Sequence, residues 1–160
     1  MFKLAQTDNL VTKIARSDQG VLWVGIGCQR GTSKQLIEEA IWAVCRSNDL
    51  TEKAINSRSW CHAIAGIATI DRKANEEGLV AFCQAHQLPL KTFPAEVLRL
   101  VIVPNPTPFV EQGVATPSVA EAAAIMADHG TLRVSKQIFK RENQPGAVTV
   151  AIAQSKKKIC

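Results

Sequence analysis

The chain has 160 residues, with a hydrophobic content of 46%, a charged content of 21% and a formal net charge of +5. These values indicate a globular protein with room for one hydrophobic core, and they exclude a chain that is disordered throughout. No apolar run reaches the length of a membrane span and the first residues are too polar for a signal peptide, so we expect a cytoplasmic protein with no membrane partner.

Strand and helix patterns alternate along the chain. Val21–Ile26 is an apolar run that predicts a strand. A helix is predicted from Thr32 to about Arg46, and Thr32 with Gln35 has the spacing of a capping box. Ala63–Ile70 predicts a second strand, and its nearly continuous apolar sequence is typical of a sheet covered on both faces.

The second half of the chain continues this alternation. In chain order we predict a helix, a short strand, a short helix, an alanine-rich helix and two final strands, at Asn75–His86, Leu90–Phe93, Pro94–Leu100, Ser118–Asp128, Thr131–Ser135 and Val148–Ala153. Gly130 stands where a helix C-terminal cap is expected. The loop between the last two strands holds no helix pattern, so these strands are predicted to pair antiparallel.

This order of elements predicts the fold class: an α/β protein of three layers, with a mixed, mostly parallel sheet and helices on both faces. Val21–Ile26 and Ala63–Ile70 are expected to be adjacent inner strands that run parallel. A single domain is predicted over residues 21–154, preceded by a partly ordered arm at 1–20 and followed by a basic tail at 155–160.

The stretch from Gly25 to Thr32, with the sequence GIGCQRGT, lies between the first strand and the helix that follows it. Glycine permits positive φ angles and lets a ligand approach the backbone closely. The start of the helix supplies N–H groups and the positive end of a dipole, and Arg30 supplies a guanidinium. The stretch therefore predicts a site for a phosphate or a carboxylate, and the alternative is a tight turn that binds nothing.

Two known phosphate-binding motifs fit this stretch poorly. A P-loop requires a lysine directly after its last glycine, whereas Thr32 and Ser33 follow Gly31. In the dinucleotide fingerprint the third glycine comes one residue earlier than Gly31 does here. A general anion site is thus favoured over a nicotinamide site. An unrelated nucleotide- or phosphate-binding α/β domain stays open as the alternative function.

Charged residues directly follow the second strand, at Asp71, Arg72 and Lys73. Ligands of α/β sheets bind beyond the C-terminal ends of the strands, so this segment and the glycine stretch are expected to face one crevice. Asp71 is a candidate general base and Lys73 a candidate carboxylate-binding group, and both are expected to point to the same side of an extended segment. The alternative assigns Asp71 to a helix N-cap and Lys73 to a solvated charge.

Three further residues have both a functional and a structural interpretation. Ser118 and Glu121 have the spacing of a capping box, and Glu121 is also placed to face the crevice from the first helical turn. Cys28 is either a thiol with a lowered pKa at the start of a helix or a small residue in a tight turn, and we favour the second interpretation.

Cysteine and charge patterns exclude other classes of site. The five cysteines include no C-x-x-C pair, so neither a disulfide framework nor a zinc site is predicted, and we expect no metal and no cofactor. Cys45 and Cys83 lie in helical patterns and are predicted to be small core residues. The excess of basic over acidic residues is compatible with nucleic-acid binding. However, the aromatic content is only 5% and no RRM, KH or zinc-finger pattern is present, so we expect no nucleic-acid partner.

Four segments, in this order, carry a resemblance to a known family: Gly25–Thr32; Ala68–Lys73 with Glu76 and Gly78-Leu79; Pro117–Ala123; and Val148–Ala153. The chain resembles the C-terminal domain of the cobalt-precorrin-5A hydrolase of cobalamin (vitamin B12) biosynthesis, a domain that also occurs alone in the aerobic pathway. The resemblance covers about residues 21–154. Gln29 is a departure, because the family usually carries a second basic residue there.

The resemblance implies that the chain acts on or binds a precorrin or cobalt-precorrin intermediate, an anionic tetrapyrrole, with other corrin-pathway enzymes as partners. The full hydrolase opens a lactone and releases acetaldehyde, and it has N-terminal sequence that this chain lacks. Hydrolysis with a separate N-terminal partner and binding alone therefore both stay open. The candidate catalytic residues are Asp71, Lys73 and Glu121, and the candidate ligand-binding residues are Gly27, Cys28, Arg30, Gly31, Thr32 and Ser118.

Overall fold

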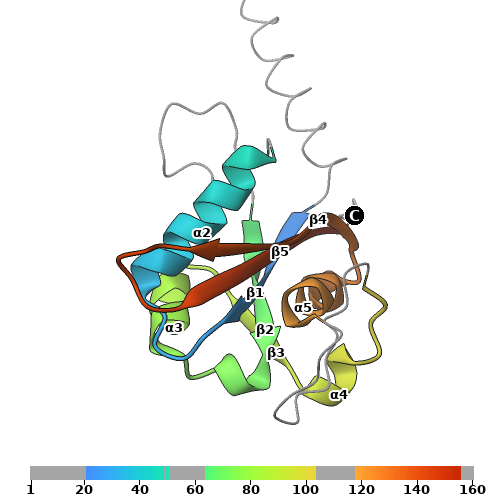
Figure 1. Ribbon diagram of the computed structural model, residues 1–160. Helices are drawn as coiled ribbons and strands as arrows, with labels where there is room; N and C mark the ends of the chain where they lie inside the picture. The colour runs from blue at the N-terminus through green and yellow to red at the C-terminus, as the bar shows by residue number, and fades with distance from the viewer. Residues whose placement is uncertain (1–20, 49, 51–63, 104–117, 156–160) are drawn as a thin grey trace, which may run out of the picture.

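The computed structural model describes residues 21–48, 50, 64–103 and 118–155 (Figure 1). In chain order the elements are β1 (Val21–Cys28), α2 (Lys34–Ser47), β2 (Ile64–Ile70), the 3₁₀ turn η2 (Asp71–Lys73), α3 (Glu77–Ala85), β3 (Leu90–Phe93), α4 (Ala95–Leu98), α5 (Val119–Asp128), β4 (Thr131–Lys140) and β5 (Ala147–Ser155). The predicted arm at 1–20 and the basic residues at 156–158 lie outside the described residues.

The strands form a five-stranded sheet in the order β3-β2-β1-β5-β4. β1 pairs parallel with β2, placing Gly25 beside Ala68, and β2 pairs parallel with β3. β5 lies antiparallel to both β1 and β4. The predicted pair of adjacent inner parallel strands is confirmed, and so is the antiparallel final pair that makes the sheet mixed.

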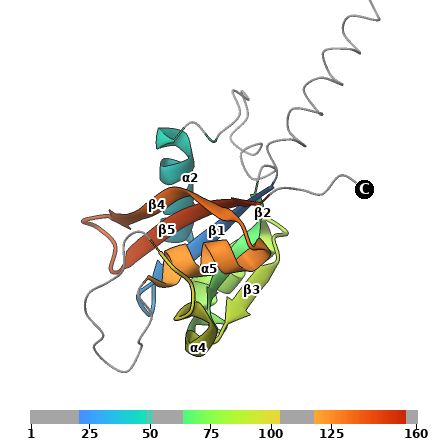
Figure 2. The ribbon, with the colours of Figure 1, turned by 90° about the vertical axis from the view of Figure 1, so that its right-hand side faces the viewer.

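Helices cover both faces of the sheet, so the predicted three-layer α/β fold is confirmed. α2 and α3 lie on one face and α5 lies on the other (Figure 1), and Figure 2 shows α5 in front of the sheet and α2 behind it. The side chains of β1 alternate between the two layers because successive residues of a strand point to opposite faces. Val24 and Ile26 are in the core under α2 and α3, whereas Trp23 is in the core under α5.

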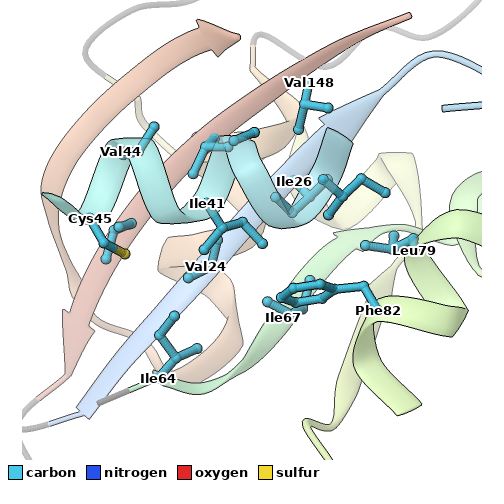
Figure 3. Packing of buried hydrophobic residues seen from close by; sticks show 14 of the residues in the cluster. Val24, Ile26, Ile41, Val44, Cys45, Ile64, Ile67, Leu79, Phe82 and Val148 are labelled. Atoms are coloured by element: carbon cyan, nitrogen blue, oxygen red, sulfur yellow. The ribbon is translucent and has the colours of Figure 1, made fainter. Parts of the chain in front are cut away.

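The larger core lies between the sheet and helices α2 and α3. Figure 3 shows Ile41 of α2 above Val24 of β1, with Phe82 of α3 beside Ile67 of β2. All four of these side chains are 0% exposed. Burial of branched and aromatic side chains on this scale is the main force that holds the helices on the sheet. It also fixes the starts of α2 and α3 relative to the ends of β1 and β2.

Small residues bring α5 unusually close to β1. The buried face of α5 is built from alanines, namely Ala120, Ala122, Ala123, Ala124 and Ala127. Gly25 faces this helix from within β1, and a Cβ atom there would lie 1.8 Å from the carbonyl oxygen of Ala120. The sequence pattern assigned Gly25 to a ligand-binding turn. The structure places it inside the strand, where it makes room for the helix backbone.

Two helix caps differ from the prediction. The N-cap of α2 is Ser33, whose Oγ accepts a hydrogen bond of 3.0 Å from the Leu36 N–H, so Thr32 is not the cap. At the end of α5 the left-handed residue is His129, with φ of 49°, and not Gly130. A Cβ atom on Gly130 would instead lie 2.7 Å from the Gln154 carbonyl oxygen, so this glycine permits close contact with β5.

Candidate functional site

A cleft of about 1140 Å³ lies beyond the C-terminal ends of β1 and β2, which reach the same end of the sheet (Figure 1). Its walls come from the segment after β1, from η2 and from the first residues of three helices. Six of the candidate site residues line it: Gly27, Cys28, Arg30, Gly31, Thr32 and Lys73. Asp71, Ser118 and Glu121 are not among the residues that line it.

The turn between β1 and α2 is shorter than the sequence pattern suggested. β1 continues to Cys28, so Gly27 is a strand residue, and in the turn itself Gly31 has the positive φ of 84°. The turn is closed by Thr32, whose N–H and hydroxyl both donate to the Gln29 carbonyl, at 3.2 and 2.6 Å. Thr32 is 2% exposed, so its hydroxyl is used inside the turn.

The loop between β4 and β5, together with the first residue of β5, supports this turn from the side. The Gln29 N–H donates to the Ala147 carbonyl at 3.3 Å, and the Ser33 hydroxyl donates to Oε1 of Gln144 at 2.9 Å. Contacts from a second segment restrict the number of conformations that the turn can adopt. A backbone held in this way is suited to binding a ligand with little additional loss of entropy.

Three helix N-termini meet at the cleft. Lys34 begins α2, Glu77 begins α3 and Val119 begins α5, and all three residues line the cavity. Each helix directs the positive end of its dipole and its first N–H groups toward this region. Gly78 allows the start of α3 to approach the turn, because a Cβ atom there would lie 2.2 Å from the Thr32 carbonyl oxygen. The backbone thus favours an anion before any side chain is considered.

Side chains add further positive charge. Arg30, Lys34, Arg72 and Lys73 line the cleft, against the two carboxylates of Glu76 and Glu77. Positive side chains therefore outnumber negative ones among the described residues that line it. Guanidinium and ammonium groups on flexible stems can reach several carboxylates of one ligand at once.

A carboxylate of the chain itself occupies the glycine turn. Oε1 of Glu76, at the N-cap of α3, accepts a hydrogen bond of 2.6 Å from the Gly31 N–H, across 45 residues of sequence. In the sequence Glu76 stands out only as part of the family resemblance, and no local pattern predicts this contact. The contact depends on β1 and β2 being neighbours, because that pairing brings the start of α3 beside the turn.

The thiol of Cys28 is not activated. Burial raises its pKa from 9.0 to about 11, while the nearby Lys73 ammonium lowers the pKa and the Glu76 carboxylate raises it further. The thiol is therefore protonated at neutral pH and is a poor nucleophile. This agrees with the favoured interpretation of Cys28 as a small residue, here at the last position of β1.

Asp71 and Lys73 do not lie on an extended segment, so the expectation that they point to the same side was wrong. They form the 3₁₀ turn η2, in which the Ala74 N–H donates to the Asp71 carbonyl at 3.0 Å. A 3₁₀ turn has three residues per turn, so side chains two positions apart diverge by about 120°. Lys73 lines the cleft and Asp71 is exposed outside it. Asp71 is also no helix cap, because those positions belong to Ile70 and Glu76.

Ser118 and Glu121 hold α5 in place. The Ser118 Oγ accepts a hydrogen bond of 3.4 Å from the Glu121 N–H, as the capping interpretation predicts. The Glu121 side chain is 0% exposed, and its Oε2 accepts a hydrogen bond of 3.0 Å from the Lys136 N–H of β4. The carboxylate therefore faces the edge strand and not the cleft.

The described part of the chain shows no sign of a metal site or of a membrane-spanning helix. Within it, no three side chains of histidine, cysteine, aspartate or glutamate gather in a way that could hold a metal ion. None of the helices there combines the length and the apolar character that crossing a membrane requires.

The sequence matches the family described as "Cobalamin synthesis G C-terminus" over residues 22–153. The chain belongs to this family. The resemblance seen in the four sequence segments is therefore confirmed, and the protein is a member of a family of cobalamin biosynthesis proteins. No curated protein matches the sequence.

Two solved structures of cobalamin biosynthesis proteins are similar to this family member. One is "CobE, a protein from the cobalamin (vitamin B12) biosynthetic pathway", with a TM-score of 0.63 and 23% identity over 85% of this chain and 91% of that chain. At that identity the likeness shows the fold alone. The other is the cobalamin biosynthesis protein chiG from Agrobacterium tumefaciens, with a TM-score of 0.57 and 28% identity over 84% of this chain and 98% of that chain.

Proposed function

We propose that this protein binds a carboxylate-rich corrin-ring intermediate of cobalamin biosynthesis, a precorrin or cobalt-precorrin, in the cleft beyond β1 and β2. The observation that carries the proposal is the convergence of three helix N-termini with four cationic side chains on one cavity. Precorrins carry acetate and propionate side chains around the ring, and each is a carboxylate at neutral pH. A cavity of about 1140 Å³ is large enough for one side of such a ring with its carboxylates.

Binding is supported better than hydrolysis by this chain alone. Of the three candidate catalytic residues, Lys73 lines the cleft, whereas Asp71 lies outside it and Glu121 bonds to β4. The Cys28 thiol in the cleft is protonated at neutral pH, because its pKa is about 11. A positively charged cleft in which the described thiol is protonated, and from which the candidate general base Asp71 is absent, is suited to holding a labile anion. Opening of a lactone then requires groups from a separate partner.

The direct test is a titration monitored by the absorbance of the corrin. Cobyrinic acid, whose ring side chains are free carboxylates, is a stable probe, and cobinamide, in which these groups are amidated, is its matched control. We expect saturable binding of cobyrinic acid that weakens steeply as salt concentration rises, and much weaker binding of cobinamide. Equal affinity for the two corrins, or no binding of either, contradicts the proposal.

Two further experiments separate corrin binding from phosphate binding and from hydrolysis. Inorganic phosphate, ATP and NAD, tested as competitors of cobyrinic acid, address the alternative of a phosphate-binding domain, and a nucleotide that binds more tightly than the corrin favours that alternative. Release of acetaldehyde from cobalt-precorrin-5A addresses hydrolysis. We expect no acetaldehyde from this protein alone, and its release at a catalytic rate would show that the chain is a hydrolase.

A further inference from the structure

We infer that Glu76 occupies the carboxylate subsite of the cleft in the free protein, and that a carboxylate of the bound ligand displaces it from the Gly31 N–H. This inference rests on the proposed function and adds to it the atom that receives the ligand and the group that leaves. It also defines the chemistry of the subsite as that of a planar carboxylate.

The geometry of the Gly31 N–H supports this assignment. Gly31 has φ of 84°, a conformation that other residues rarely adopt, and its N–H points to Oε1 of Glu76 at 2.6 Å. The two atoms are within hydrogen-bonding distance, and a ligand carboxylate would meet the same donor. Gly31 and the Glu76 hydrogen bond are on the exposed side of the turn, where a ligand can reach the same N–H.

Glu76 can leave without loss of the helix it begins. Its backbone makes the bonds that start α3: the Glu76 N–H donates to the Lys73 carbonyl at 3.0 Å, and the Glu76 carbonyl accepts from Val80 at 2.9 Å. The carboxylate itself makes no cap bond within α3. A rotation of the side chain alone therefore opens the Gly31 N–H, while the turn stays closed by Thr32.

The charge balance of the cleft explains why exchange is favourable for a ligand with several carboxylates. In the free protein the Glu76 carboxylate offsets part of the positive charge of Arg30 and Lys73, all of which line the cavity. A corrin brings several carboxylates for the one that it displaces. A ligand with a single carboxylate only replaces one such group by another, so the subsite selects for polycarboxylates.

Glu77 provides a matched control for a test. It also lines the cleft, it is the next residue in sequence, and it carries the same charge, but its carboxylate is not the one at Gly31. Glu76→Gln removes the charge and leaves a weaker, neutral acceptor beside the turn. Glu77→Gln removes the same charge from the same cavity and leaves the Gly31 contact unchanged.

The experiment is a titration of the wild-type protein, Glu76→Gln and Glu77→Gln with cobyrinic acid, with the Gly31 amide followed by ¹⁵N–¹H NMR. We expect Glu76→Gln to bind about tenfold more tightly than wild type. Glu77→Gln should gain markedly less, because it removes the same repulsion of the ligand but opens no hydrogen-bond donor. In wild type we expect the Gly31 amide signal to move on binding, which gives a readout even if a variant fails to fold.

The outcomes distinguish the two proposals. If wild type binds cobyrinic acid but the two variants change affinity equally, or the Gly31 amide signal does not move, the displacement of Glu76 is wrong and the proposed function stands. If none of the three proteins binds cobyrinic acid, the proposed function is wrong, and so is the displacement of Glu76 that depends on it.

Discussion

The backbone N–H of Lys136 donates a hydrogen bond of 3.0 Å to Oε2 of Glu121, a side chain that is 0% exposed. This contact joins α5 to β4 between Val134 and Gln137, where the pairing of β4 with β5 shifts register. A strand backbone that leaves its regular ladder needs another acceptor for its N–H groups, and a buried carboxylate supplies one. The burial of the Glu121 side chain is thus explained by its contact with β4, without a role in ligand binding.

A first prediction follows for Glu121. Glu121→Ala should lower the free energy of unfolding by about 2–4 kcal/mol, because it removes a buried hydrogen-bond acceptor and leaves a cavity. Glu121→Gln, which keeps an acceptor of the same shape, should lose markedly less. Urea denaturation measures both losses. If Glu121→Ala is as stable as wild type but no longer binds the corrin, the structural role is wrong and Glu121 belongs to the binding site.

A second prediction concerns the close packing of α5 on β1. Gly25→Ala should destabilise the protein by about 1–3 kcal/mol or more, because the added methyl group overlaps the backbone of α5. Gly27→Ala is the control two residues along the same strand, where the nearest atom to an added Cβ is the Thr149 Cβ at an ordinary 3.7 Å. Thermal denaturation should show a large loss for Gly25→Ala and little for Gly27→Ala. Equal melting temperatures for the two variants would contradict this account of Gly25.

A third prediction concerns the thiol of Cys28. Its pKa is raised from 9.0 to about 11 chiefly by burial, so its alkylation by iodoacetamide should be slow at pH 7–8 and rise only toward pH 11. Mass spectrometry of the Cys28 peptide, with N-acetylcysteine as an unburied reference, measures this rate. An alkylation midpoint below pH 9 would mean that the thiolate is stabilised in the cleft.

The same shift has a consequence for stability. Because the pKa of Cys28 is higher in the folded protein, its contribution to stability is fully present below pH 9 and is lost as pH rises through about 11. Cys83 has the same raised pKa of about 11, also from burial, and acts in the same direction. Substitution of Cys28 by alanine should therefore reduce the loss of stability between pH 9 and 11. An unchanged pH profile in this variant would contradict the assignment.

The layers of the fold were predictable because they depend on local patterns. The apolar runs that became β1 and β2 are buried on both faces, and the helical spacing of Leu36, Ile37, Ala40 and Ile41 is the buried face of α2. The predicted strand Leu90–Phe93 matches β3 in full. These signals are strong because burial selects apolar residues at the period of each element.

Residue-level roles were less predictable where two neighbours share the same chemistry. Thr32 and Ser33 both carry hydroxyls, and the sequence does not say that Ser33 caps α2 while Thr32 closes the turn. Glycines have the same ambiguity, since Gly25 provides packing space and Gly31 provides a positive φ.

Contacts between distant segments were beyond local reasoning. The Glu76–Gly31 hydrogen bond needs the neighbouring positions of β1 and β2, and the Glu121–Lys136 bond needs the register shift in β4. A sequence pattern shows that a carboxylate is present near a strand or helix end. The strand order decides whether it faces a cleft or another element.

Whether the cleft binds a carboxylate-rich corrin can be tested with Arg30→Ala, compared with Arg46→Ala. Arg30 lines the cleft, whereas Arg46 lies in the last turn of α2, at the opposite end from Lys34, with its guanidinium 4.8 Å from the centroid of the Trp42 ring. Each variant lowers the net charge of the protein by the same amount.

The measurement is the dissociation constant for cobyrinic acid at constant ionic strength, with a melting curve for each protein. We expect Arg30→Ala to weaken binding by about 1.5–3 kcal/mol with an unchanged melting temperature, and Arg46→Ala to leave the affinity near wild type. Equal affinities for the two variants would show that the corrin does not bind in this cleft.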